Sequence, residues 1–298
     1  MSTVSLPAGT EPVPGTPAGP SAAQRRVGRR WYRQPALMAG IIIIAVIVIA
    51  ALAAPLLTPY NPTTQNLTAS LLGPSAHHLL GTDQLGRDTF TRLLYGLRVD
   101  LRIAFIAVLL PFVLGVILGS LAGYFGGWAD VVVMRLVDIV VAFPFYVLVI
   151  ALVFVLGPGE RSIYIAISAV GWVSYARIVR GEILVAKRQE YVLAAQSGGL
   201  SSLRIMGKHL LPNVISQAFI YGMSDIVQDI LAIVTLGYFG LGVPPPTADL
   251  GSMINDGQNF LSTHWQLTTI PGLVVVLVGL GLSLIGDGLA DILRPGQS

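Results

Sequence analysis

The sequence contains no cysteine and very little charge. Among its 298 residues there is no Cys, and Asp, Glu, Lys and Arg together make up only 11%. The absence of cysteine excludes disulfides, thiolate metal sites and cysteine nucleophiles. Soluble domains usually carry roughly 25% charged residues, more than twice this share. Water is therefore not the main solvent of this chain.

The usual signatures of ATP, metal and nucleic-acid binding are also missing. No Gly-rich phosphate loop ends in Gly-Lys-Ser or Gly-Lys-Thr, so we expect this chain to bind no ATP itself. His77, His78 and His264 lack the spacing of metal ligands, and we assign no metal, no cofactor and no catalytic residue. The net charge of +3 comes from basic residues that border apolar segments, which does not favour a nucleic-acid partner.

Long apolar runs are abundant instead, since 54% of the residues are hydrophobic. A membrane-spanning helix needs about 20 predominantly apolar residues, and runs with little or no charge predict six of them. We therefore expect an all-α membrane protein with six transmembrane helices. The predicted spans are Leu37–Leu57, Ile103–Phe125, Ile139–Leu156, Ile163–Ala176, Val214–Gly242 and Leu267–Ile285.

The first apolar run could instead be a cleaved export signal, because arginines precede it and small residues follow. At about 20 residues it exceeds the usual signal core of about 7 to 15, which favours a permanent anchor. Residues 1–36 are expected to form a disordered, basic cytoplasmic tail, and residues 37–298 a single transmembrane domain. Residues from about 58 to 99 are polar and contain turn signals, which predicts an ordered external loop.

The positions of Lys and Arg predict the orientation, because positively charged loops stay in the cytoplasm. With six spans both termini lie on one side, and placing them inside puts twelve of the eighteen basic residues in the cytoplasm. This favours N-in and C-in. The twelve are Arg25, Arg26, Arg29, Arg30, Arg33, Arg177, Arg180, Lys187, Arg188, Arg204, Lys208 and Arg294.

One long polar segment, about 187–213, lies on the predicted cytoplasmic side. Helix formers from Gln189 to Ser197 predict a short helix that Gly198 and Gly199 terminate. Ser201 or Ser202 can cap a second short helix, and Pro212 is expected to prevent its simple continuation. A rigid pair of helices could transmit force to a partner. From these residues alone, an amphipathic helix on the lipid headgroups stays equally open.

Three separated blocks of sequence resemble the permease subunits of bacterial ABC importers, and specifically the oligopeptide/dipeptide/nickel group. Their order and the long first external loop are similar to the C-type member of the two-permease pair. The resemblance covers about Leu79 to Leu289. Its blocks are Leu80–Asp88 with Arg92–Arg98, then Glu190–Ala195 with Gly199 and Lys208–Asn213, and then Gly237–Gly242 with Pro244–Pro246, followed by Gly286–Leu289.

This resemblance implies a type I ABC importer permease fold in the bacterial cytoplasmic membrane. It implies a homologous sister permease, two P-loop ATPase subunits that bind ATP and Mg, and an extracytoplasmic substrate-binding protein. Peptides lead as substrate, while nickel chelates, glutathione and oligosaccharides stay open. The residues implied to couple to the ATPase are Glu190, Leu193, Ala194, Ala195, Gly199, His209, Leu211 and Pro212.

The chain departs from the family's pattern in this loop. Leu193 stands where relatives usually carry an acidic residue, and His209 stands at a usually hydrophobic position; Ile233 replaces a Glu that many relatives have. Without a carboxylate at Leu193, a specific salt bridge there is in doubt. We therefore expect the ATPase to be held mainly by packing around Ala194, Ala195 and Gly199, with weak sensitivity to salt.

Two acidic residues, Asp225 and Asp229, interrupt the fifth predicted span. Their i, i+4 spacing places them on one helix face, and ionisable groups inside a membrane usually face a cavity or a partner. We expect them to line the translocation pathway and attract a cationic part of the substrate; pairing across a packed interface is the structural alternative. A secondary transporter with these residues as ion-coupling sites, or an aspartyl intramembrane enzyme, are the alternative functions.

Overall fold

The computed structural model describes residues 34–293, which are all-helical apart from loops. Five helices are long and apolar enough to cross a membrane, and α4 with α5 forms a sixth candidate span. The expected all-α membrane fold is confirmed. The α-helices are α1 (Pro35–Leu52), α2 (Ala54–Leu57), α3 (Thr89–Phe125), α4 (Gly127–Val141), α5 (Phe145–Leu156), α6 (Glu160–Ala186), α7 (Glu190–Ser197), α8 (Ser202–Ile205), α9 (Leu211–Tyr238), α10 (Leu250–Gly257) and α11 (Gln266–Leu293).

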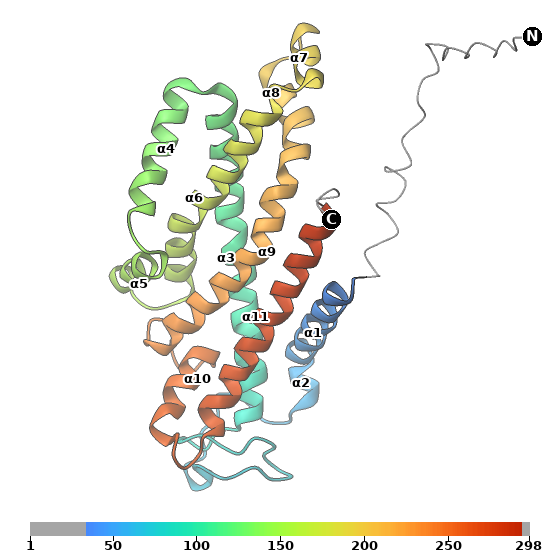
Figure 1. The fold of residues 1–298 in the computed structure, drawn as a ribbon. Coiled ribbons are helices and arrows are strands. Elements are labelled where there is room, and N and C mark those ends of the chain that lie inside the picture. The colour runs from blue at the N-terminus through green and yellow to red at the C-terminus, as the bar shows by residue number, and fades with distance from the viewer. Residues whose placement is uncertain (1–33, 294–298) are drawn as a thin grey trace, which may run out of the picture.

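Three single turns complete the helical structure: 3₁₀ turns η3 (Leu67–Ala69) and η5 (Gln258–Phe260), and the π-helical turn η4 (Met206–Leu210). The long helices α3, α6, α9 and α11 lie side by side, and α1 stands at the edge beside α11 (Figure 1). Helices α7 and α8 extend beyond one end of the bundle, whereas α10 and residues 58–88 lie at the other.

The chain ends bear on the orientation of the bundle. The start of α1 and the end of α11 both point toward the end that carries α7 and α8, as expected for six spans (Figure 1). Because positively charged loops stay inside, we call this the cytoplasmic end and the opposite one the external end. The predicted tail, residues 1–36, falls mostly outside the described residues, as do its arginines and Arg294.

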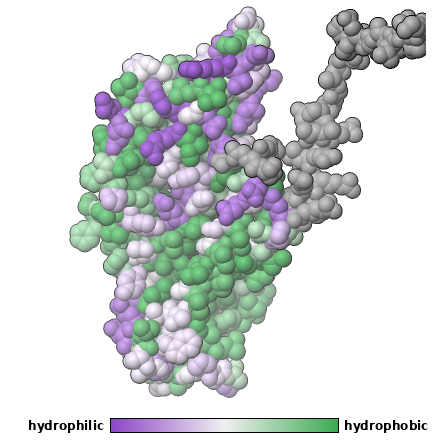
Figure 2. Space-filling model, in the orientation of Figure 1, coloured by the Kyte–Doolittle hydropathy of each residue, from purple (hydrophilic) through white to green (hydrophobic). Residues whose placement is uncertain are grey.

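The surface fits a lipid environment. Figure 2 shows a largely hydrophobic band across the middle of the molecule, with hydrophilic residues gathered toward its two ends. Many large apolar side chains of the helices are exposed, among them Phe105 on α3 and Val147 and Val155 on α5. In water such a surface would be an aggregation site, whereas in a bilayer it is the expected outer face.

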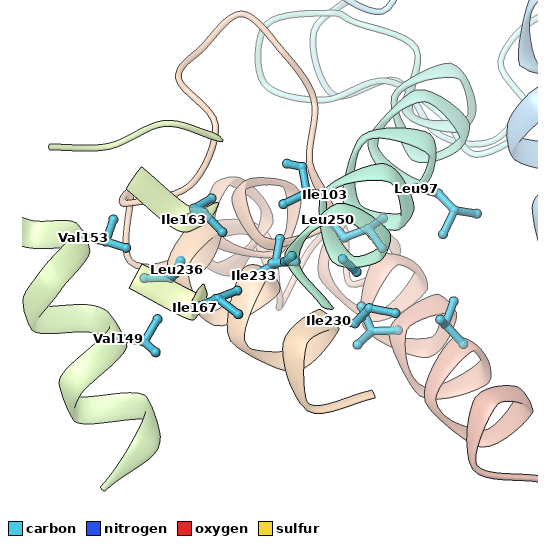
Figure 3. Close-up of a cluster of buried hydrophobic side chains, with 14 of the residues drawn as sticks. Leu97, Ile103, Val149, Val153, Ile163, Ile167, Ile230, Ile233, Leu236 and Leu250 are labelled. Atoms are coloured by element: carbon cyan, nitrogen blue, oxygen red, sulfur yellow. The ribbon is translucent and has the colours of Figure 1, made fainter. Parts of the chain in front are cut away.

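A continuous apolar core fills the external half of the bundle. It joins residues of α3, α5, α6, α9 and α10, including Ile103, Val153, Ile167, Ile233 and Leu250 (Figure 3). Each of these five side chains is at most 2% exposed. A second core in the cytoplasmic half contains Tyr175, Val179 and Ile183 of α6. Helix α6 contributes to both, and it is the most buried of the five long spans.

Close packing of α3 on α6 depends on glycines that recur every fourth residue. Gly115, Gly119 and Gly123 lie against the backbone of α6. A Cβ atom added at Gly119 would lie 2.9 Å from the Cα of Ala176, and one at Gly123 would lie 3.0 Å from the carbonyl oxygen of Arg180. Small residues at this spacing let membrane helices approach until their backbones touch.

The third predicted span, Ile139–Leu156, is wrong as a single straight helix. Helix α4 begins at Gly127, and it meets α5 at an angle of 88°. The chain breaks before Pro144, because a proline has no N–H to donate and disfavours the helical conformation in the residue before it. The pair together still connects the cytoplasmic end of α3 to the external end of α6.

The predicted external loop, about 58–99, is eleven residues too long, because α3 begins at Thr89, and the second span starts earlier than Ile103. Helix α3 begins at Thr89, where the Asp88 side chain caps it by accepting a hydrogen bond from the Thr91 N–H at 2.7 Å. Charge misled the prediction, since Arg92 and Asp100 lie in this helix yet are almost completely buried. The fourth span likewise runs to Ala186 rather than Ala176.

Candidate functional site

The predicted pair of short helices at the cytoplasmic end is present. Helices α7 and α8 are separated by residues 198–201, and together they project past the ends of α4, α6 and α9 (Figure 1). We call residues 190–205 the knob. Helix α7 ends in a Schellman motif, in which the Leu200 N–H donates to the Ala195 carbonyl at 3.2 Å and the Gly199 N–H to the Gln196 carbonyl at 3.0 Å.

Gly199 therefore has a conformational role that spacing alone does not reveal. Its φ of +74° lies in the left-handed region, which favours glycine, and an added Cβ would meet no atom of the described chain within 4 Å. The position is thus open toward the outside but strained for any other residue. Substitution at Gly199 would disturb the knob itself as well as a partner.

The knob is fixed to the bundle by buried apolar side chains and by polar contacts at its two ends. Val192 and Ile205 are at most 1% exposed and pack in the cytoplasmic core. Before the knob, the Lys187 ammonium donates to the Gly123 carbonyl at 2.9 Å, and after it the Asn213 amide donates to the Tyr191 hydroxyl at 3.2 Å. A knob anchored in this way can pass a displacement on to the membrane helices.

The predicted coupling residues divide into an outer and an inner group. Glu190, Leu193, Ala194, Gly199 and Pro212 are exposed, whereas Ala195, His209 and Leu211 are half-buried. The outer face also carries apolar side chains.

These apolar side chains are Tyr191, Leu193 and Leu203, with exposed fractions of 43%, 48% and 70%. An apolar face at the tip of a projecting element favours binding by packing. This agrees with the absence of an acidic side chain at position 193.

The second short helix does not end at Pro212, contrary to the prediction. Helix α8, the π turn η4 and helix α9 follow one another without a break, so that Ser202–Tyr238 is one helical rod of 37 residues. Pro212 lies in the first turn of α9, where its missing N–H does least harm. The Asn213 amide donates to the His209 carbonyl at 2.9 Å, which satisfies one acceptor near the proline.

Asp225 and Asp229 are both buried residues of α9. Asp225 is 4% exposed and accepts a hydrogen bond of 2.7 Å from the hydroxyl of Tyr175, which is fully buried on α6. Asp229 is 1% exposed, and its Oδ2 has no hydrogen-bond partner among residues 34–293. A buried oxygen without a partner is destabilising and calls for an explanation. Tyr175 was not predicted from the sequence as a partner of Asp225.

A polar groove opens beside these carboxylates. It has a volume of about 470 Å³ and runs between the cytoplasmic halves of α6 and α9, with Arg177 and Glu182 on one wall and Tyr221 and Ser224 on the other. The Tyr221 ring packs edge-on against the Tyr175 ring, with the ring centroids 5.0 Å apart. Tyr221 therefore separates the groove from Asp225.

The first sequence block, Leu80–Asp88, builds the external loop. Asp83 accepts hydrogen bonds from the backbone N–H groups of Leu85 and Arg87 at 2.9 and 3.0 Å. The Arg87 guanidinium pairs with Asp83 at 2.7 Å and with Asp256 of α10 at 3.3 Å, and Arg92 pairs with Asp83 at 3.3 Å. These ion pairs hold the loop to α10, which gives the block a structural role.

His78, to which we assigned no metal, lies in the same loop. Its Nδ1 lies 2.8 Å from Asp88 Oδ2, and its ring stacks on Tyr60 with the ring centroids 4.9 Å apart. Over the part of the chain that the structure describes, no three His, Cys, Asp or Glu side chains converge in a manner that could hold a metal ion.

Helix α10 was not predicted, and it explains the third sequence block. Gly237, near the end of α9, packs on Gly251 of α10, and Gly240 ends α9 with a φ of +75°. The Asp249 side chain caps α10 by accepting from the Ser252 N–H at 2.8 Å, and Asp100 accepts from the Leu250 N–H at 2.9 Å.

Asp249 is almost completely buried, and this burial raises the pKa of its carboxyl group. Hydrogen bonds from Ser252 and the charge of Arg92 oppose this rise in the pKa. The signal in the sequence was the acidic cap before a short apolar run, Asp249-Leu250-Gly251-Ser252-Met253.

A bundle of apolar helices, a rigid cytoplasmic knob and a polar groove that enters the membrane together define a multi-pass membrane permease. The chain belongs to the family of binding-protein-dependent transport system inner membrane components, whose model matches residues 115–298. Residues 24–74 match the N-terminal transmembrane domain of oligopeptide transport permease C, which extends the similarity upstream of Leu79. The secondary-transporter alternative is therefore rejected.

Named relatives cover most of this chain. The dipeptide transport system permease protein of Bacillus subtilis is 40% identical over 90% of this chain and 84% of its own length. The oligopeptide transport system permease protein of the same species is 40% identical over 89% and 87%. The di/tripeptide transport system permease protein of Pseudomonas aeruginosa is 36% identical over 87% of each chain.

Proposed function

We propose that this chain is the C-type permease subunit of an ATP-driven importer of di- and oligopeptides. The observation that carries the proposal is the knob, because it is rigid, it projects from the cytoplasmic end of a permease bundle, and its outer face is apolar. The peptide substrate follows from the names of the relatives. The chain itself carries no phosphate-binding loop that could hydrolyse ATP.

In this proposal the chain works in an assembly. A homologous sister permease completes the pathway, two P-loop ATPase subunits bind ATP and Mg and dock on the knobs, and an extracytoplasmic protein delivers the peptide. Closing and opening of the ATPase dimer displaces the knob, and the membrane helices follow because Val192 and Ile205 are packed among them. The pathway then alternates between its two openings without any chemistry in this chain.

Reconstitution tests the proposal. In liposomes that contain this chain with its sister permease and ATPases, and with the binding protein on the opposite side, we expect accumulation of a labelled dipeptide only with ATP and Mg. The matched control contains ATPase subunits that bind but do not hydrolyse ATP. Uptake by the purified chain alone, or uptake driven by an ion gradient without ATP, would contradict the proposal.

We further propose that Asp225 and Asp229 supply negative potential to the pathway through Tyr221, although neither carboxylate lies on its surface. Replacing both by asparagine keeps their size but removes the charge, and we expect the KM for import of peptides with a free amino group to rise several-fold. Tyr175→Phe is the control, since it removes the 2.7 Å hydrogen bond to Asp225 but leaves the charge in place. Unchanged import kinetics for every peptide in the double variant would show the idea to be wrong.

A further inference from the structure

Polar side chains that line an open groove at membrane depth need a partner other than lipid. Ser224 lies thirteen residues into α9, about 20 Å from the cytoplasmic start of this helix. Arg177 lies nine residues before the cytoplasmic end of α6, about 14 Å from that end. Both side chains are exposed, and both line the groove. Exposing such groups to lipid hydrocarbon is energetically unfavourable, so the groove is filled by water, substrate or protein.

Within residues 34–293, one cation and one anion that line the groove lack an ion-pair partner. Among the described residues, the Arg177 guanidinium and the half-exposed Glu182 carboxylate have no ion-pair partner. The neighbouring Arg180, by contrast, is paired with Asp130 of α4 at 2.5 and 2.6 Å. Charges inside a membrane protein are usually paired within the fold, so an unpaired set of opposite sign is suited to a ligand that carries both charges.

A glycine keeps this groove wide. Gly181 lies between the two charged residues on α6, and an added Cβ would meet no atom of the described chain within 4 Å. Glycine inside a helix is less stable than alanine by about 1 kcal/mol. Since no atom of residues 34–293 requires a glycine there, the small residue is suited to an occupant from outside this part of the chain.

We propose that this groove is a contact surface for the transported peptide, in which Arg177 binds the carboxylate end and Glu182 the amino end of a short zwitterion. This rests on the proposed function. The groove volume of about 470 Å³ lies within the range of about 300 to 1,000 Å³ of small-ligand pockets. Contacts to the two termini suit a pathway that must pass peptides of many sequences, because every peptide with free ends carries these charges.

The cysteine-free sequence allows a direct test of hydration. In the reconstituted importer, with cysteine-free partners, Ser224→Cys should react with a charged, membrane-impermeant methanethiosulfonate reagent at least about tenfold faster than Val113→Cys, because thiolates form only in water. Val113 is exposed on the apolar face of α3 and lies about 18 Å from its cytoplasmic end, so it matches the depth of Ser224. Gly181→Cys is a second reporter within the groove.

Charge-neutral variants test the ligand. Arg177→Gln and Glu182→Gln are each expected to raise the KM for dipeptide import about fivefold, as expected for a charged contact in a hydrated site. The control Arg161→Gln removes an exposed arginine of the same helix outside the groove and should leave the KM unchanged. The affinity of the external binding protein for the peptide, measured separately, is untouched by any of these changes.

The outcomes separate this inference from the function on which it rests. If the importer transports peptide but Ser224→Cys and Gly181→Cys react as slowly as Val113→Cys, lipid or the sister permease covers the groove and the inference is wrong. If both glutamine variants transport with an unchanged KM, the charges do not contact peptide and the inference is equally overturned. If the unaltered chain supports no ATP-driven uptake with its partners, the proposed function fails first.

Discussion

Replacing Ala194 by aspartate is expected to abolish co-purification of the ATPase subunits with the membrane complex. Ala194 is exposed on the outer face of α7, so the aspartate leaves the knob folded but places a carboxylate in the docking surface. Burying a charge without a partner costs several kcal/mol, and a loss of about 3 kcal/mol weakens binding about a hundredfold. The measurement is the amount of ATPase retained on the affinity-purified permease, together with ATPase stimulation by the loaded binding protein.

Two controls separate packing from electrostatics at the knob. Arg204→Gln removes an exposed charge from α8 and should leave association intact, and the unaltered complex should survive raised salt. Gly199→Asp is a poorer probe, because the φ of +74° makes any side chain there strained. Retention of the ATPase by the Ala194→Asp variant, or release of the unaltered complex by salt alone, would refute docking by packing.

Gly119→Leu should prevent the chain from accumulating as a folded membrane protein. The glycine lies against the backbone of α6, where even a Cβ atom would be 2.9 Å from the Cα of Ala176. Overfilling a packed interface typically costs about 1 to 3 kcal/mol, and more is expected here because backbone atoms cannot turn aside as a side chain can. The measurement is the yield of monodisperse protein in detergent and its melting temperature.

Gly272→Leu is the matched control for this prediction. Gly272 also lies inside a membrane helix, α11, but an added Cβ would meet nothing within 4 Å in the described chain. Equal losses for the two variants would mean that any large residue at a glycine of a membrane helix lowers the yield, and not the close approach of α3 and α6 in particular. A nearly normal yield of Gly119→Leu would disprove the packing account.

The elements that sequence reasoning predicted well carry strong local signals. Apolar runs with little or no charge marked the membrane helices, and the glycine pair at 198–199 marked the end of α7, because left-handed backbone favours glycine. Leu193 and Ala194, which the resemblance implied to be coupling residues, are exposed on α7, and their coupling role stays a prediction. Local propensity was sufficient in these places.

The errors come from tertiary contacts that a linear pattern does not show. Arg92 and Asp100 were placed outside the predicted spans, yet both are buried in α3, where Arg92 pairs with Asp83 and Asp100 Oδ2 accepts a hydrogen bond from the Leu250 N–H. The position of Asp225 against Tyr175 joins residues fifty positions apart. Likewise, the glycine spacing of α3 was visible in the sequence, but its partner on α6 was not. Such pairings depend on which helices meet, and hydrophobic periodicity does not specify that.

The continuous helix from Ser202 to Tyr238 connects the knob to the external end of the bundle. Its 37 residues measure about 55 Å along the helix. Ile205 is buried at the base of the knob, and Gly237 packs on α10 at the external end. By linkage, if closure of the proposed ATPase dimer changes the affinity of the permease for the extracytoplasmic protein, that protein changes the free energy of closure by the same amount. In the proposed importer, locking the ATPase dimer shut should therefore change the affinity of the extracytoplasmic protein for the permease. The ratio of the two affinities gives the coupling free energy, and it can be measured without any peptide transport.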